Sequence, residues 1–277
     1  DFGRRVALAA DNARLYAERD HTARALQAGL LPTSLPSVPG VDIAARYLAA
    51  GTRSEVGGDF YDVFRAEGDR TWIVVGDVSG KGPEAAAVVG LARHTLRALG
   101  RRERLPRRLL ADLHDAMLLE ARGEFCTLVC GLLVPEPDGG FTLTVASAGH
   151  PAPIVRRADG RIERTAITGT LVGMPIEVSF TEEVVRLGPG DAVVIHTDGV
   201  TEERDANGEE FGDVRLSWAV RSAGNGAQAI ADHILATVRA YGSGAPRDDI
   251  AVVAIEVTEE RVKPDEQESI VESGERR

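Results

Sequence analysis

Apolar positions along the chain change their spacing near residue 32, and that change separates two predicted regions. Through residues 1–31 they recur at alternating four- and three-residue steps, which predicts one helix with a coiled-coil seam. Pro32 ends this helix, because the residue before a proline is disfavoured in the α region. The seam consists of Phe2, Val6, Ala9, Ala13 and Tyr16, and Asp20 and Gln27 interrupt it further on.

Two interpretations fit this first helix. It either packs on its own domain or serves as a linker that pairs two chains. The sequence opens in mid-helix without a capping residue, which favours a linker from a missing upstream domain. We therefore expect residues 1–31 to be a helical linker that supports a homodimer.

From Val41 onward, short alternating apolar runs separated by turn residues predict β-strands. The predicted strands are Val41–Ala49, Phe60–Arg65, Thr71–Gly76, Thr127–Val134, Thr142–Ala146, Ile154–Arg157, Phe180–Leu187, Ala192–His196 and Ile250–Val257. Helical spacing predicts helices at Pro83–Leu99, Pro106–Ala121 and about Val214–Tyr241. Hairpins that alternate with helix pairs favour an α+β fold with antiparallel sheets between helices, rather than a doubly wound parallel sheet. The charged segment 259–277 is expected to be a disordered tail.

Composition excludes several classes of protein. The 277 residues are 43% hydrophobic and 27% charged, as expected for a globular protein with one catalytic domain and an appendage. A net charge of −11 argues against nucleic-acid binding, which needs a clustered cationic surface. No apolar run has the length of a membrane span and no signal-peptide core opens the sequence, so we expect a cytoplasmic protein without membrane contact.

The two cysteines are too few for a disulfide framework. Cys126 and Cys130 are spaced as C-x-x-x-C, which matches neither a zinc knuckle nor a redox-active C-x-x-C pair. We interpret both as buried apolar residues in a strand.

Aspartates recur where predicted strands meet loops. They lie in VGGDFYD (56–62), VVGDVSGKG (74–82), VIHTDG (194–199) and RDDIAV (247–252). One aspartate beside a glycine is a common turn, but four such places indicate a shared site. Oxygen ligands without a His or Cys cluster favour Mg²⁺ or Mn²⁺. A cation between the carboxylates would also offset their mutual repulsion.

The segments VGGDFYD, GDVSGKG, SAGHPAP, TDGVTE and DDIAVV occur in the order and spacing of the PPM-type phosphatases. Over about residues 28–258 the sequence resembles their bacterial SpoIIE/RsbU-like branch. This resemblance implies an αββα sandwich of two antiparallel sheets flanked by helices, with the phosphatase domain at residues 32–258. It also implies that residues 1–31 are like the connector that follows a GAF or PAS sensor domain.

The resemblance also implies roles for individual residues. Asp77 would bridge two metal ions, and the Val78 carbonyl would bind one of them. Asp59 would complete the ligands of the second ion, and Asp198 would hold the first. Asp59, Asp77 and Asp198 are thus the predicted catalytic residues.

One further ligand of the first ion comes from the last motif. Asp248 and Asp249 are both candidates, and Asp248 is preferred because the first residue of this motif ligates in the family. Two Mn²⁺ or Mg²⁺ ions at such a site lower the pKa of a bridging water and clamp the phosphoryl oxygens, so no nucleophilic Ser or Cys is needed. Gly57 and Gly58 let the backbone approach the ions.

Other polar residues near these motifs have more than one interpretation. His150 is either a general acid or substrate contact, or a structural histidine at a turn. His196 is interpreted as a strand residue rather than a ligand, and Arg53 as a solvated loop residue rather than a phosphate contact. Asp62 either supports the metal site or is solvated at a strand edge.

Two remaining features are given no chemical role. Glu202 and Glu203 are expected to solvate the start of a helix. GDVSGKG is not a P-loop, because only three residues separate Gly76 from Gly80 and Gly82 stands where Ser or Thr is required.

The sequence therefore predicts a metal-dependent protein serine/threonine phosphatase. Its substrate, by resemblance alone, would be a phosphorylated STAS-type anti-sigma-factor antagonist in a partner-switching pathway. Two alternatives are a non-catalytic partner-binding module of the same fold and a two-metal phosphohydrolase for small molecules. Loss of a motif aspartate would mark the non-catalytic module, and every motif here keeps its aspartate.

Overall fold

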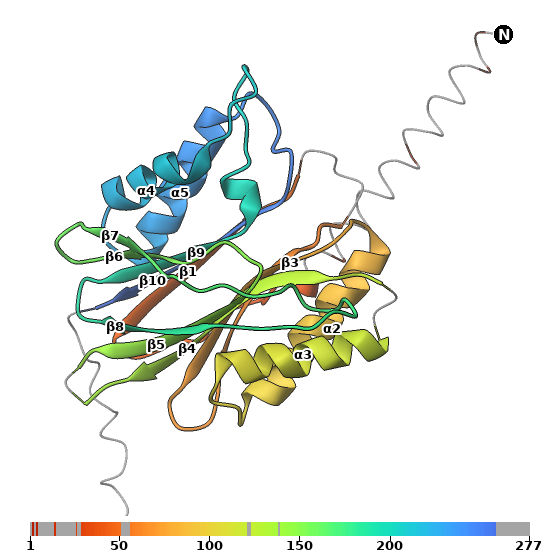
Figure 1. The fold of residues 1–277 in the computed structure, drawn as a ribbon. Helices are drawn as coiled ribbons and strands as arrows, with labels where there is room; N and C mark the ends of the chain where they lie inside the picture. Colours follow the sequence, from red (N-terminus) through yellow and green to blue (C-terminus); the bar gives the residue numbers. More distant parts are fainter. Residues whose placement is uncertain are drawn as a thin grey trace, which may run out of the picture.

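The computed structural model describes residues 29–50, 56–120, 123–137 and 139–258, together with Phe2, Arg4, Arg14 and Leu26 (Figure 1). The strands are β1 (Val41–Leu48), β2 (Asp59–Arg65), β3 (Thr71–Val78), β4 (Cys126–Pro135), β5 (Phe141–Ala148), β6 (Ile154–Arg156), β7 (Ile162–Arg164), β8 (Glu182–Leu187), β9 (Ala192–His196) and β10 (Ile250–Val257). The helices are α2 (Pro83–Gly100), α3 (Pro106–Glu120), the 3₁₀ turn η1 (Asp198–Val200), α4 (Gly212–Ser222) and α5 (Ala227–Tyr241).

These strands form two five-stranded antiparallel sheets. The first has the order β1-β10-β9-β6-β7 and the second has the order β2-β3-β4-β5-β8. Figure 1 shows α2 and α3 against the second sheet and α4 and α5 against the first. The predicted antiparallel sheets between helices are therefore confirmed.

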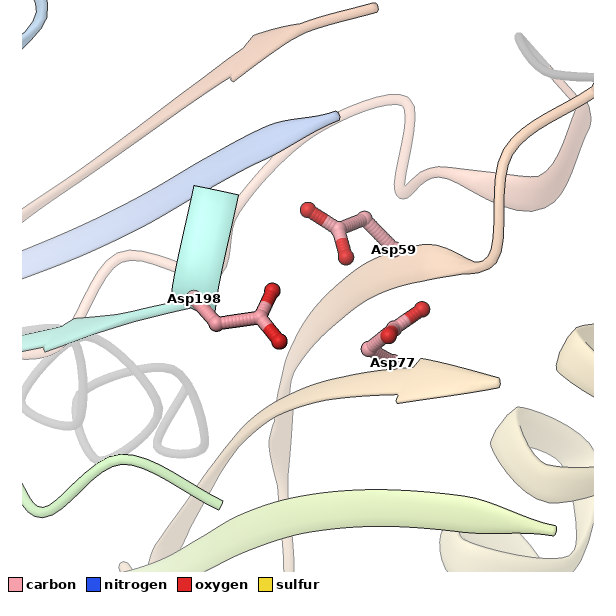
Figure 2. A group of neighbouring side chains, drawn as sticks. All are labelled: Asp59, Asp77 and Asp198. Carbon is pink, nitrogen blue, oxygen red and sulfur yellow. The ribbon is translucent and has the colours of Figure 1, made fainter. Parts of the chain in front are cut away.

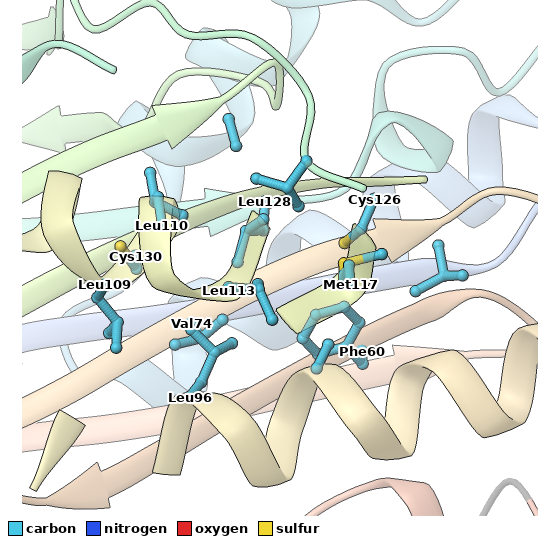
Figure 3. Packing of buried hydrophobic residues seen from close by; sticks show 14 of the residues in the cluster. Phe60, Val74, Leu96, Leu109, Leu110, Leu113, Met117, Cys126, Leu128 and Cys130 are labelled. Atoms are coloured by element: carbon cyan, nitrogen blue, oxygen red, sulfur yellow. The ribbon is translucent and has the colours of Figure 1, made fainter. Parts of the chain in front are cut away.

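Alternation along β3 explains how one strand joins two cores. Trp72 and Val74 face α2 and α3, whereas Ile73 and Val75 face the other sheet, because successive side chains of a strand point to opposite faces. The core under α2 and α3 appears in Figure 3, where the labelled side chains are Phe60, Val74, Leu96, Leu109, Leu110, Leu113, Met117, Cys126, Leu128 and Cys130. Cys126 and Cys130 lie fully buried in β4, as predicted.

Two details differ from the sequence prediction. The short strand β7 was not predicted, because its three residues carry too little alternation to signal a strand. The single helical region predicted at Val214–Tyr241 is two helices, because Ala223 is extended and Gly226 has a φ of 93°. Ala223 ends α4 and Gly226 precedes α5; neither conformation is helical, and the positive φ of Gly226 favours glycine.

The linker prediction falls almost wholly outside the described residues. Of the proposed seam only Phe2 is described, whereas Val6, Ala9, Ala13 and Tyr16 are not. The tail at residues 259–277 is likewise outside. Among the described residues, no helix is both long and apolar enough to cross a membrane.

Candidate metal centre

Three predicted aspartates come together where the two sheets meet. Asp59 begins β2 and lies opposite Asp77 of β3 in the antiparallel register. Asp198 begins η1, directly after β9 of the other sheet. One carboxylate oxygen from each of the three lies within 4.8 Å of the others, and Figure 2 shows the three side chains gathered there, with those of Asp59 and Asp198 turned toward each other.

Two glycines allow the loop before β2 to approach this group closely. A Cβ on Gly58 would lie 2.0 Å from the Val78 carbonyl oxygen and 2.6 Å from Asp77 Oδ1. A Cβ on Gly57 would lie 1.3 Å from Asp249 Oδ2. No side chain fits at those separations, so the site requires glycine at both positions.

The two aspartates of the last motif occupy different environments. Asp248 is exposed at the rim, with its Oδ1 2.8 Å from Lys81 Nζ. Asp249 is buried, and its carboxylate accepts hydrogen bonds from the Ala50 amide at 2.7 Å and from the Tyr47 hydroxyl. Asp249 Oδ2 is buried without a hydrogen-bond partner. Neither residue belongs to the group of three.

Negative charge dominates the electrostatics of the site. Burial and the neighbouring carboxylates Asp198, Asp248 and Asp249 raise the pKa of Asp77 to about 7. Burial, together with Asp77, raises the pKa of Asp59 well above its usual value. The pKa values of Asp198 and Asp249 are also raised, in both cases mainly by burial. The folded chain thus holds several carboxylates in a place that disfavours their ionised forms.

Thr197 is a site residue that the sequence interpretation missed. Its hydroxyl donates to Asp59 Oδ2 at 2.6 Å and accepts from the Ala251 amide at 2.9 Å. Through these two bonds it fixes Asp59 of one sheet against β10 of the other. Its position directly before Asp198 was the available signal, but a threonine at a strand end has no distinctive chemistry.

The two histidines lie in the core beside the site. His150 is 7% exposed, its Nδ1 is 3.0 Å from the Thr127 hydroxyl, and burial and nearby His196 lower its pKa to about 3. A buried neutral imidazole favours the structural interpretation of His150. His196 ends β9 with its Nδ1 3.0 Å from the Thr197 carbonyl oxygen, which agrees with its interpretation as a strand residue.

Asp62 has a role that neither earlier interpretation included. It is 1% exposed, and its two oxygens lie 2.6 and 2.7 Å from the Arg97 guanidinium, with Arg93 at 3.3 Å. It therefore joins β2 to α2 and is neither part of the metal site nor solvated. Arg53 lies outside the described residues.

The expectation for Glu202 and Glu203 is wrong in part. Both follow η1, and the next α-helix begins only at Gly212. Glu202 is exposed, whereas Glu203 is 5% exposed and accepts a hydrogen bond from the Arg204 amide at 3.2 Å. Glu203 is therefore a buried loop residue and not a solvating one.

The donors present fit hard divalent cations. All are oxygens, as Mg²⁺ and Mn²⁺ prefer. The unpartnered Asp249 Oδ2, the closely approaching Val78 carbonyl and the raised pKa values are the features expected where a cation compensates the carboxylates.

A family model described as "Stage II sporulation protein E (SpoIIE)" matches residues 67–258. Protein IcfG of Synechocystis sp. is 29% identical over 266 residues, which cover 84% of this chain and 40% of IcfG. Phosphoserine phosphatase RsbU of Bacillus subtilis is 26% identical over 184 residues, which cover 66% of this chain and 53% of RsbU. The chain thus spans about half the length of these relatives.

Solved structures share the fold. The RsbU and RsbW domains of Rv1364c from Mycobacterium tuberculosis match with a TM-score of 0.65 and 28% identity, over 83% of this chain and 63% of that one. The SiaA-PP2C domain of Pseudomonas aeruginosa has a TM-score of 0.72 and 23% identity, over 90% and 98%. The catalytic domain of the serine threonine protein phosphatase PstP, solved with two manganese ions, has a TM-score of 0.56 and 17% identity, over 79% and 98%. The predicted αββα sandwich is the PP2C-type fold.

Proposed function

The chain belongs to the SpoIIE family of PPM-type phosphatases, and we propose that it hydrolyses phosphoserine or phosphothreonine on a partner protein with the help of two divalent cations. The observation that carries this proposal is the group of Asp59, Asp77 and Asp198, with ligand oxygens within 4.8 Å of one another. The fold explains why three such carboxylates gather. A partner-binding module without catalysis would not need them there.

We infer the ligands from these surroundings. Asp77 lies opposite Asp59 in the strand register, and its carboxylate is close to those of both Asp59 and Asp198, so it is the residue that would hold both cations, with the Val78 carbonyl nearby. Asp248 is the proposed ligand from the last motif, because it stands at the open rim and its charge acts on both Asp77 and Asp198. Bound cations supply water activation and neutralise the phosphoryl oxygens.

The protein's own residues hold this arrangement in place. Thr197 orients Asp59 through its hydroxyl, so one carboxylate oxygen has a fixed direction. The buried Asp249 carboxylate is held next to the site by hydrogen bonds from the Ala50 amide and the Tyr47 hydroxyl. Gly57 and Gly58 keep the loop close enough to exclude other side chains. Such preorganisation is what electrostatic catalysis requires.

The proposed substrate is a phosphorylated STAS-type anti-sigma-factor antagonist. Its support is the similarity to RsbU and to a chain that contains RsbU and RsbW domains. The proposal includes a cytoplasmic location, since the proposed partner-switching substrate would be found in the cytoplasm. It also includes a linker role for residues 1–31, a phosphatase domain at 32–258 and a disordered tail at 259–277.

The decisive experiment measures phosphate release from a phosphoserine STAS-domain protein and from free nucleotides, each with Mn²⁺, with Mg²⁺ and with EDTA. We expect turnover of the phosphoprotein that EDTA removes and that either cation restores. Faster hydrolysis of nucleotides would favour a small-molecule phosphohydrolase. Binding of the phosphoprotein without any turnover would favour the non-catalytic module.

The linker proposal has a separate test. Sedimentation and activity of the whole chain are compared with those of a chain that begins near Leu35. We expect a dimer only when residues 1–31 are present, since the proposed seam lies there. Monomers with equal rates in both proteins would contradict it.

A further inference from the structure

Lys81 brings positive charge to the rim of the aspartate group. Its Nζ lies 2.8 Å from Asp248 Oδ1. Its charge opposes the rise in the pKa of Asp77 and of Asp249. Within the described part of the chain, no arginine forms an ion pair with Asp59, Asp77 or Asp198, and Lys81 is one of only two lysines in the sequence.

The loop that carries Lys81 is tied to the site on both sides. Before it, the Ser79 amide donates to the Phe125 carbonyl at 2.8 Å. After it, the Gly82 amide donates to the Val56 carbonyl at 2.7 Å, beside the two glycines of the close loop. The backbone at Gly80 and Gly82 has φ values of 94° and 99°, which favour glycine. The backbone that carries the Lys81 ammonium is therefore held in place on both sides.

The partner of Lys81 is exchangeable. Its side chain is 37% exposed and that of Asp248 is 55% exposed, so the pair stands in water, where ion pairs are weak. If a cation takes the Asp248 carboxylate, the three N–H donors of Lys81 become available at the rim. A phosphate dianion is the ligand that such a point charge suits.

We propose that Lys81 binds the phosphoryl group of the substrate, and that Asp248 is its partner when no cation occupies the site. This inference rests on the proposed phosphatase activity and adds a residue to it. It also gives the site a positively charged side chain, among the described residues, that can bind phosphate.

The test compares Lys81→Met and Lys81→Arg with the unaltered protein, using p-nitrophenyl phosphate as substrate and orthophosphate as inhibitor. For Lys81→Met we expect KM and the inhibition constant for orthophosphate to rise about tenfold, with kcat within about twofold. Lys81→Arg restores most of the affinity because it keeps the charge. Arg161→Met, which removes an exposed ion pair with Asp159 at 2.7 Å on the β6–β7 hairpin, is the matched control and leaves all constants unchanged.

A second readout does not depend on turnover. Calorimetric titration with Mn²⁺ alone should show equal or tighter binding to Lys81→Met, since a competing cation is gone from Asp248. Titration of the Mn²⁺-loaded protein with orthophosphate should show the tenfold loss directly, even if no phosphomonoester is hydrolysed and the proposed activity fails. A fall in kcat and Mn²⁺ affinity with unchanged orthophosphate binding would overturn the inference and leave Lys81 only as a support for Asp248. Unchanged constants in all assays would also overturn it.

Discussion

Two buried aspartates on β2, three residues apart, have opposite surroundings. Asp62 is 1% exposed and is neutralised by two arginines of α2. Asp59 is 4% exposed, and the charged groups that act on it are the carboxylates Asp77, Asp249 and Asp198. One position is compensated within the chain, whereas the other is not.

Strand geometry separates the two. Side chains three residues apart on a strand point to opposite faces, so Asp62 shares the helix-facing side with Phe60 and Phe64. Asp59 points toward the other sheet, where Thr197 and Asp198 arrive. A buried charge that serves the fold is paired by the protein itself. A buried charge that the protein leaves uncompensated marks the place for a cation.

The largest expected effect is on activity in the uncompensated group of carboxylates that includes Asp59 and its strand neighbour Asp77. Asp77→Asn should lower turnover of a phosphoserine protein by about 10³-fold, because the proposed bridge between two cations loses its charge. The fold should persist, since the raised pKa of Asp77 shows that its charged form is disfavoured there. Activity in Mn²⁺ and circular dichroism are measured together. Near-normal Mn²⁺-dependent turnover would show that Asp77 is not the bridge.

At the compensated position, Asp62, a substitution should lower stability and leave turnover nearly unchanged. Asp62→Asn should lower the free energy of unfolding by about 3 kcal/mol, the low end for breaking a buried ion pair, because Arg97 is 43% exposed and can reach water. Turnover per folded molecule should stay close to normal. Urea unfolding gives the free energy of unfolding, and the rate of Mn²⁺-dependent phosphate release divided by the concentration of folded protein gives the turnover. Asp159→Asn, at an exposed ion pair, is the control and should leave stability unchanged. A large loss of turnover with unchanged stability would reverse the comparison.

The contrast between Asp59 and Asp62 also shows which structural features could be predicted from the sequence. The strand periodicity was enough to predict antiparallel sheets between helices, and the four aspartate segments were enough to predict a shared site. The two-sheet sandwich and the roles of Asp59, Asp77 and Asp198 followed from the resemblance. Periodicity would also have placed Asp62 on the opposite face, but its partner Arg97 lies 35 residues away on a helix. Side-chain pairs between separate elements depend on how the elements pack, and a single sequence does not encode that in a local pattern.

The residues around the centre were hidden for the same reason. The bond from Thr197 to Asp59 joins positions 138 residues apart, and only the stacked sheets bring them together. Asp248 and Asp249 are identical in type and adjacent, yet one is exposed with Lys81 and the other is buried. Their difference arises from their positions just before the start of β10 and not from their residue type.

A smaller effect is expected on stability as a function of pH. The folded-state pKa of Asp77 is about 7, above the usual 3.8, so between these values the folded protein binds more protons than the unfolded chain. Stability of the metal-free protein therefore falls as pH rises through this window. The lowered pKa values of His150 and His196 act in the other direction, up to their unfolded value of 6.5.

Mn²⁺ separates the two contributions. The Tm measured with Mn²⁺ minus the Tm measured with EDTA should increase from pH 5 to pH 8 by several degrees, because the cation offsets only the carboxylates. In Asp77→Asn the increase should be smaller, since one of the titrating groups is gone. A difference in Tm that does not change with pH would mean that the carboxylates are compensated without a cation.

The smallest expected effect concerns a third kind of buried ionisable group, one that the protein keeps neutral. Cys126 lies opposite Val78 in the sheet, two strands from Asp59, and is fully buried. Burial and the charge of Asp77 raise the pKa of its thiol, and burial does the same for Cys130. Since the thiolate is the reactive form, iodoacetamide should alkylate neither residue in the native protein at pH 8 and should leave Mn²⁺-dependent turnover unchanged. Mass spectrometry of native and urea-unfolded samples measures the alkylation, and the unfolded sample, in which both thiols react, is the control. Because EDTA should abolish turnover in the same preparation, the pair of reagents tests whether the centre consists of oxygen ligands alone. Rapid native alkylation of Cys126 with loss of activity would instead make the thiol a part of the site.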